Sequence, residues 1–133
     1  MAKEEVIVCD TNILLAVIKN HIPTVRILSG LTNEFTEWRN MYISIITYGE
    51  ILPVTQKKER KKIIAFLRNF TLLHIDKRAS LFTKELMNES YYYAGLLADG
   101  LIGASAITNG IPIWTYNKKD FQQFKGIRFF NPR

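Results

Sequence analysis

Short runs of apolar residues alternate along the chain with longer segments in which apolar residues recur at helical spacing. A short apolar run bounded by polar residues is typical of a buried strand. On this pattern we expect strands at Val6–Cys9, Met41–Ile43, Leu72–Ile75, Ile111–Tyr116 and Arg128–Phe130.

The segments between these runs predict helices. We expect them at Ile13–Lys19, from Pro23 onward, from about Ser44 or Thr47, and at Lys57–Asn69, Lys77–Met87 and Gly100–Asn109. Asn12 is available as the N-cap of the first helix. Asp99 suits the N-cap of the last one, which Gly110 ends.

Strands that alternate with helices indicate βαβ units, in which helices cover both faces of a parallel sheet. We therefore predict an α/β fold with three layers, α/β/α, around a central, mostly parallel sheet. The 133 residues suit one domain over residues 1–133, and no repeat, linker or low-complexity tract divides them. The order of the strands does not follow from this pattern.

Composition narrows the setting in which the protein works. The single cysteine, Cys9, cannot form an internal disulfide, and no cluster of Cys and His supplies the ligands of a zinc site. The acidic residues within Met1–Glu5 do not suit a signal peptide, and no apolar run is long enough to cross a bilayer. These features predict a cytoplasmic protein with no membrane partner.

The net charge is +6, from 18 Lys and Arg against 12 Asp and Glu. An excess of cations favours a polyanionic partner such as nucleic acid. The densest basic run, Lys57–Lys62, has two interpretations. It is either the solvated face of a helix or a rim that contacts phosphates.

Acidic residues stand at several places where a strand ends or a helix begins, namely Asp10, Glu50, Asp99 and Asp120. Open α/β sheets hold their ligands in the loops at the carboxyl ends of the strands. Carboxylates gathered there repel one another unless they are protonated or bridged by cations. Oxygen ligands select hard cations, so we expect Mg²⁺ or Mn²⁺ as the cofactor.

Each of these acids also has an ordinary structural explanation. Asp10 and Asp99 suit helix N-caps, and Glu50 could complete a capping box with Thr47. Asp120 could be a turn acid or the cap of a helix at Phe121–Lys125. These interpretations explain the acids one by one, whereas a shared metal explains them together.

In order and spacing, the motifs around these acids resemble those of the PIN-domain nucleases, and most closely the small VapC-type toxins. The motifs are Asp10-Thr11-Asn12 after the first strand, Ser44–Glu50, Asp99–Ala106 with Gly110 closing the helix, and Thr115–Asn117 leading to Asp120-Phe121. The resemblance extends over nearly the whole chain and implies a PIN-like fold.

The resemblance further implies a metal-dependent endoribonuclease that is the toxin of a toxin–antitoxin pair. Asp10, Glu50, Asp99 and Asp120 would then be the catalytic, metal-holding acids. Thr11, Asn12, Thr115 and Asn117 would support them or bind substrate. The implied partners are an RNA substrate, an antitoxin protein and a second copy of the chain in a homodimer.

Two features depart from the pattern of these toxins. The segment Tyr91–Ala98 is unusually apolar and aromatic, which favours a dimer interface there. The pair Lys118-Lys119 is compatible with an ion pair that keeps Asp120 away from the metal.

Other functions stay open at this point. A non-catalytic PIN-like domain that binds RNA or acts as a scaffold would keep the fold without turnover. An enzyme that forms an aspartyl-phosphate would also place an acid such as Asp10 after its first strand. That chemistry usually needs a second acid two residues later, where this chain has Asn12.

Overall fold

The structure, a computed structural model, describes residues 5–89 and 95–132 of the chain. Its centre is a sheet with the strand order β3-β2-β1-β4, in which all neighbouring strands run parallel. The strands are β1 (Ile7–Cys9), β2 (Met41–Ser44), β3 (Thr71–Leu73) and β4 (Ile113–Trp114). The predicted parallel sheet is confirmed.

The strand predicted at Arg128–Phe130 is not formed as a strand. Phe129 makes one isolated parallel bridge with Ile113, flanked by backbone hydrogen bonds of 2.8 and 2.9 Å. The next N–H donor in this register would belong to residue 132. That residue is Pro132, which has no N–H, so the ladder stops.

Helices connect the strands. The α-helices are α1 (Thr11–Ile18), α2 (Ile22–Gly30), α3 (Ile45–Ile51), α4 (Arg60–Leu67), α5 (Lys77–Glu89), α6 (Leu96–Thr108) and α7 (Lys118–Phe121). A π-helical turn, η2 (Leu31–Phe35), continues α2, and 3₁₀ turns lie at η3 (Trp38–Asn40), η4 (Leu52–Val54) and η5 (Lys57–Glu59). The helix predicted at Lys57–Asn69 is therefore divided into η5 and α4.

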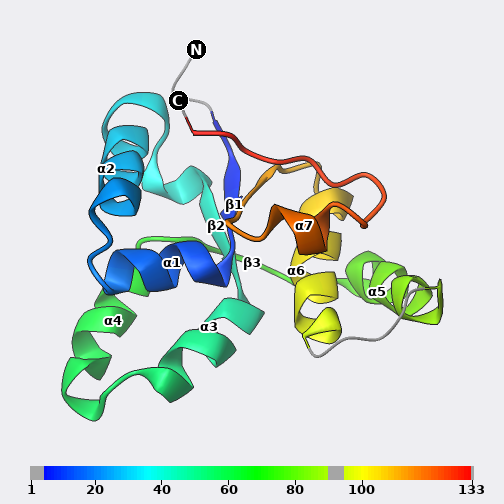
Figure 1. The fold of residues 1–133 in the computed structure, drawn as a ribbon, viewed down its shortest axis with the longest axis horizontal. Coiled ribbons are helices and arrows are strands. Elements are labelled where there is room, and N and C mark those ends of the chain that lie inside the picture. The colour runs from blue at the N-terminus through cyan, green and yellow to red at the C-terminus, as the bar shows by residue number, and fades with distance from the viewer. Residues whose placement is uncertain (1–4, 90–94, 133) are drawn as a thin grey trace.

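The side chains of β1 alternate between the two faces of the sheet. Ile7 and Cys9 belong to one apolar core, whereas Val8 belongs to another that includes Leu96 and Ile102. Helices α1, α2 and α4 lie on one side of the sheet, and α5, α6 and α7 lie on the other (Figure 1). This arrangement confirms the predicted α/β/α layers.

The first helix begins earlier than its apolar spacing indicates. α1 starts at Thr11, and its N-cap is Asp10, whose carboxylate accepts a 2.8 Å hydrogen bond from the Thr11 N–H. The prediction of Asn12 as the N-cap is wrong. The capping explanation of Asp10 is confirmed.

The start of α3 excludes the predicted capping box. Ser44 is the N-cap, and its hydroxyl oxygen accepts from the Ile46 N–H at 3.1 Å. Thr47 therefore lies inside the helix, where it cannot cap and cannot form the box with Glu50. The alternative start at Ser44 is confirmed.

Helices α6 and α7 also begin before the acids that were expected to cap them. Gly95, with φ +95°, is the N-cap of α6, so Asp99 lies in the first turn of the helix. Asn117 occupies the N-cap position of α7, and Asp120 lies within its first turn. Neither Asp99 nor Asp120 is a helix cap, and the helix expected at Phe121–Lys125 lies instead at Lys118–Phe121.

Two glycines of the α6 region are required by the fold. Gly110 follows the helix with φ +66°, and the N–H groups of Gly110 and Ile111 each donate at 3.0 Å to carbonyls of the last turn. Within the helix, a Cβ atom on Gly103 would lie 2.6 Å from the ring of Phe124. Only glycine fits there without movement of that ring.

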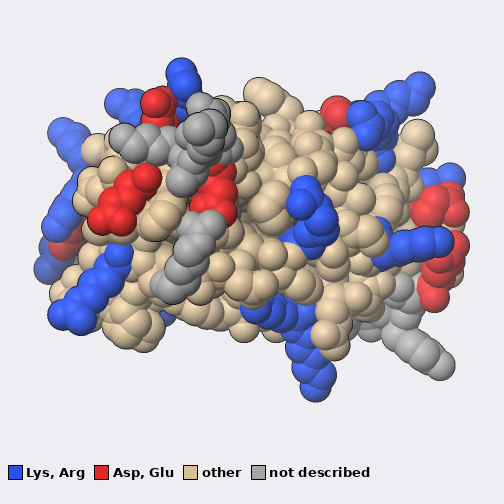
Figure 2. Space-filling view, turned by 90° about the horizontal axis from the view of Figure 1, so that it is seen from above, with Lys and Arg blue, Asp and Glu red and all other residues tan. Residues whose placement is uncertain are grey.

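On the face at the amino ends of the strands, positive and negative side chains are mixed, and neither sign dominates one region (Figure 2). Figure 2 shows that Lys and Arg side chains project mainly around the rim of this face, interspersed with Asp and Glu at both ends. Among the described residues, no helix is both long enough and apolar enough to cross a membrane.

Candidate functional site

The parallel sheet brings the ends of β1, β2 and β4 to one edge. Asp10 follows β1 and Thr115 follows β4, and the Asp10 N–H donates to the Trp114 carbonyl at 3.0 Å. The side chain of Glu50 reaches the same edge from α3, which follows β2. The sheet topology therefore gathers residues that are far apart in the sequence.

Asp10 is the buried acid of this edge, with 5% of its surface exposed. Its Oδ1 accepts from the Thr11 N–H and its Oδ2 from the Thr115 hydroxyl, both at 2.8 Å. Burial raises the pKa of the Asp10 carboxyl. The hydrogen bonds from Thr115 and Thr11 oppose this rise, and the nearby charge of Glu50 adds to it.

Thr11 connects Asp10 to Glu50. Its backbone N–H binds Asp10, and its hydroxyl donates to Glu50 Oε1 at 2.6 Å. The hydroxyl of Thr47 lies 3.0 Å from that of Thr11 and extends the cluster. Sequence reasoning missed Thr47 as a site residue, although its position one helical turn before Glu50 places both side chains on one face of α3.

Thr115 is the centre of the hydrogen bonds on the other side of Asp10. Besides donating to Asp10, its hydroxyl oxygen accepts from the Asn117 N–H at 2.9 Å and from Asn12 Nδ2 at 3.3 Å. Asn12 Oδ1 in turn accepts from the Tyr116 N–H at 3.2 Å. The structure thus brings together all the predicted supporting residues.

Asp120 reaches the cluster through Asn117, whose Nδ2 donates to Asp120 Oδ2 at 2.6 Å. The ion pair with Lys118 or Lys119 that the sequence allows is not formed in the part of the chain that the structure describes. The amine of Lys118 instead binds Asn131 Oδ1 at 2.5 Å. Asp120 is therefore held by an amide rather than neutralised by a cation.

Asp99 lies on the sheet-facing stripe of α6, because it precedes the buried residues Ile102 and Ala106 by three and seven positions. α6 leads into β4, so its amino end lies at the carboxyl edge of the parallel sheet, on the side of Asp10 (Figure 1). Asp99 is half-buried in that first turn.

Asp10 and Glu50 are paired through Thr11, but the described side chains do not form a complete set of ligands around a metal ion. Within residues 5–89 and 95–132, no three His, Cys, Asp or Glu side chains are grouped closely enough to hold a metal ion. Over the same residues, Asp10 has no cationic side chain within ion-pair distance. A buried carboxylate beside a second one suits a hard cation that takes one or two protein carboxylates and completes its shell with water or phosphate.

Other candidates from the sequence have no comparable surroundings. Cys9 is fully buried, and burial raises the pKa of its thiol well above the ordinary range.

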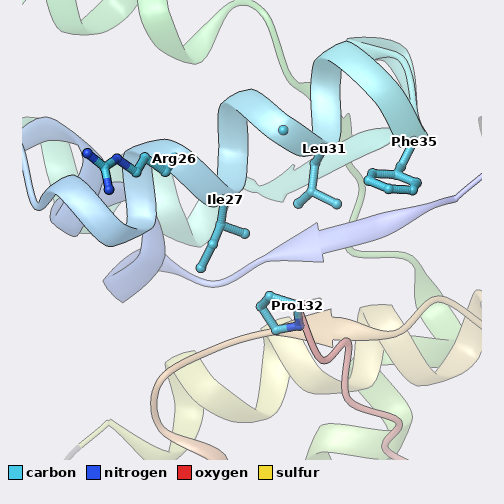
Figure 3. A pocket seen from close by; sticks show the side chains of 6 residues that line it. Arg26, Ile27, Leu31, Phe35 and Pro132 are labelled. Atoms are coloured by element: carbon cyan, nitrogen blue, oxygen red, sulfur yellow. The ribbon is translucent and has the colours of Figure 1, made fainter.

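A cavity of about 230 Å³ between α2, η2 and the carboxyl-terminal segment (Figure 3) is bordered mainly by apolar residues. Arg26 is the charged residue among the described residues that line it. The aromatic part of the segment predicted as a dimer interface, residues 91–93, lies outside the described residues.

The fold and the site together define an α/β protein with an acidic site at the carboxyl edge of a parallel sheet. A family model of the PIN domain matches residues 7–127. The chain belongs to the PIN domain family.

Several individual proteins of known sequence or structure are similar to this chain. The ribonuclease VapC1 of Rickettsia felis is 27% identical over 131 residues, covering 91% of this chain and 92% of that protein. VapBC2 from Rickettsia felis, bound to a promoter DNA fragment, has a TM-score of 0.73 at 20% identity over 96% of this chain and 99% of that one. A toxin–antitoxin complex from Klebsiella pneumoniae has a TM-score of 0.73 at 23% identity over 95% and 97%. The structural likenesses establish the shared fold.

Proposed function

We propose that this protein is a divalent-metal-dependent endoribonuclease. The observation that carries the proposal is the pairing of Asp10 with Glu50 through Thr11, at the carboxyl edge of the parallel sheet. Membership of the PIN domain family and similarity to a ribonuclease from Rickettsia felis support the choice of RNA as substrate. The metal is proposed to be Mg²⁺ or Mn²⁺, because the available ligands are carboxylate oxygens.

Within this proposal, Asp10 and Glu50 hold the metal, and Asp99 and Asp120 complete the acidic site from α6 and α7. The bound metal would lower the pKa of a water and stabilise the departing 3′ oxygen of the phosphodiester. Thr115 keeps the Asp10 carboxylate oriented through its 2.8 Å hydrogen bond, and Asn12 and Asn117 keep Thr115 in place. The expected products carry 5′-phosphate and 3′-hydroxyl ends.

The test is cleavage of purified RNA by the isolated protein in Mg²⁺, in Mn²⁺ and in EDTA. We expect cleavage with metal only, and a loss of more than about 100-fold in the Asp10→Asn variant. Asp76→Asn is a matched control, because Asp76 also accepts a helix-start hydrogen bond, from the Ala79 N–H at 2.9 Å, and asparagine preserves such a bond. Equal activity of the Asp10→Asn and parent proteins would contradict the proposal.

We further propose a protein inhibitor as partner and a homodimer as the assembly of the chain. The inhibitor proposal is supported by the similarity to a toxin–antitoxin complex from Klebsiella pneumoniae. Co-purification of a small protein encoded beside this chain, with loss of RNA cleavage in the complex, is the expected result. Sedimentation of the isolated chain tests the dimer, and a monomer at assay concentration would contradict it.

A further inference from the structure

An open hollow lies beside the acidic site, and the residues that line it have no role in the proposed cleavage reaction. Its volume is about 610 Å³, and Ala16, Lys19, His21 and Tyr116 line it. Tyr116 is 53% exposed, although it directly follows Thr115, the hydrogen-bond partner of Asp10. An exposed tyrosine ring offers a flat surface on which a planar ligand can stack.

Tyr116 is held in position at two points. Its hydroxyl shares a 2.5 Å hydrogen bond with the hydroxyl of Thr24, which is fully buried on α2. Its backbone N–H donates to Asn12 Oδ1 at 3.2 Å. Thr24 also binds His21 Nδ1 at 2.7 Å. These contacts restrict the ring before any ligand arrives, which lowers the entropy cost of stacking on it.

The hollow lies along one face of α1, and the amino end of this helix adjoins the acidic site. Asn12, Ala16 and Lys19 are separated by four and three residues, so they follow one another on the same stripe of the helix. Seven residues of α-helix rise about 10 Å. Asn12 therefore marks the end next to Asp10, Ala16 leaves space in the middle, and Lys19 places an exposed cation at the far end.

The His21 ring forms a side wall of the hollow. Its centroid lies 6.5 Å from that of Tyr116, and the two rings are inclined at 79°. A flat ligand placed against the face of Tyr116 would therefore meet His21 at its border. An exposed ring together with a nearby cation is the combination that binds a nucleobase and its phosphate in single-stranded RNA.

We propose that Tyr116, His21 and Lys19 form a subsite for one unpaired nucleotide of the RNA, in which the base stacks on Tyr116 and a phosphate contacts Lys19. The inference rests on the proposed ribonuclease function and adds to it a place for one unstacked base beside the cleaved bond. RNA is favoured over a protein partner because the hollow is lined by Tyr116, the residue after Thr115 of the acidic site, and by the cation of Lys19.

The test compares two fluorescent probes of equal length, a single-stranded oligoribonucleotide of mixed sequence and an abasic ribose-phosphate oligomer. Binding is measured by anisotropy in Mg²⁺ on the Asp10→Asn background, which we expect not to cleave. Replacing Tyr116 with leucine should weaken binding of the base-bearing probe about 5- to 150-fold and leave the abasic probe unchanged. Tyr116→Phe keeps the ring and should retain most of the affinity.

Lysine variants test the phosphate contact. Lys19→Ala should weaken binding of both probes and reduce the slope of log affinity against log salt by about one. Lys84→Ala is the matched control, because Lys84 is an exposed lysine on α5, on the other side of the sheet (Figure 1). It should bind both probes as the parent does.

The outcomes separate failure of the subsite from failure of the function. If the parent cleaves RNA but Tyr116→Leu binds the base-bearing probe normally, the subsite is wrong and the hollow is left for a protein partner. Equal weakening of both probes by Tyr116→Leu, or a loss in Tyr116→Phe as large as in Tyr116→Leu, would also overturn the stacking proposal. If the parent neither binds nor cleaves RNA, the proposed function fails and the subsite fails with it.

Discussion

The hydroxyl of Thr115 donates a 2.8 Å hydrogen bond to the carboxylate of Asp10, across 105 residues of sequence. The two residues follow neighbouring parallel strands, so the sheet itself determines their distance. The same hydroxyl accepts bonds from Asn12 and Asn117. One threonine thus links the buried acid to the segment that carries Asp120.

Removing this hydroxyl should damage both stability and activity. We expect Thr115→Val to lose about 1–3 kcal/mol of unfolding free energy, because valine leaves the buried Asp10 carboxylate and the Asn117 N–H without their partner. RNA cleavage should fall as the carboxylate loses its orientation. Thr115→Ser keeps a hydroxyl and should restore most of the activity. Urea unfolding and cleavage rates for the three proteins test this, and a fully active valine variant would show that Thr115 does not position Asp10.

The raised pKa of Asp10 predicts a specific dependence of stability on pH. Its carboxyl titrates above the usual 3.8 in the folded protein, so the folded state binds more protons than the unfolded state between the two pKa values. The stability contributed by this group is fully present below the unfolded pKa and is lost as pH rises through the folded pKa.

Urea unfolding in EDTA, from about pH 4 to pH 7, should therefore show a steeper decline for the parent than for Asp10→Asn. Asp76→Asn should follow the parent. The opposite order of slopes would mean that the Asp10 carboxylate is stabilised, not destabilised, by its surroundings in the folded protein.

A role of Asp99 in RNA cleavage can be tested separately from helix capping, because Asp99 does not cap α6. Gly95 occupies the N-cap of α6, so the Asp99→Asn variant should fold with little change in its thermal midpoint. If Asp99 belongs to the acidic site, RNA cleavage should fall at least about 10-fold, as for loss of a group that holds or orients the metal. Glu85→Gln on the exposed surface of α5 is the control and should cleave as the parent does. Normal cleavage by Asp99→Asn would remove Asp99 from the proposed site.

Gly103 and Gly49 should respond in opposite ways to alanine. In Gly103→Ala the new Cβ atom meets the Phe124 ring at 2.6 Å, and we expect a loss of about 1–3 kcal/mol from overpacking. Gly49 lies within α3, and no neighbouring side chain comes within 4 Å of the place that a Cβ atom would occupy. Gly49→Ala should therefore be neutral or should stabilise by up to about 1 kcal/mol. Thermal or urea unfolding of both variants distinguishes close packing from a general effect of glycine in helices.

Apolar periodicity predicted β1 and β2 well because most of their residues are buried, whereas β3 and β4 are shorter than the predicted Leu72–Ile75 and Ile111–Tyr116. β1 and β2 lie within a residue of their predicted ranges, and the side chains that form the core of α4, such as Ile63 and Leu67, recur at helical spacing. The positions of Asp10 and Glu50 at one sheet edge likewise follow from their places after apolar strands. The strand ranges, the core face of a helix and the place of an acid after a strand are all visible in short stretches of sequence.

Helix starts were harder to predict because several capping residues compete within a few positions. Asp10 and Asn12 both suit an N-cap, and so do Ser44 and Thr47, whereas the observed starts depend on where the preceding strand ends. The spacing of apolar residues does not show where a strand ends, so it cannot choose between these caps. The contacts of Thr24 with Tyr116 and of Thr115 with Asp10 span 92 and 105 residues, and no local pattern signals them.

The strand order β3-β2-β1-β4 also determines when the acidic site can form during synthesis of the chain. β1 is translated before the other strands of the sheet, and its neighbour β4 follows more than a hundred residues later. A nascent chain that ends before Thr115 carries Asp10 and Glu50 without the strand that completes their surroundings. The surroundings of Asp10 can therefore be completed only after β4 and Thr115 have been translated.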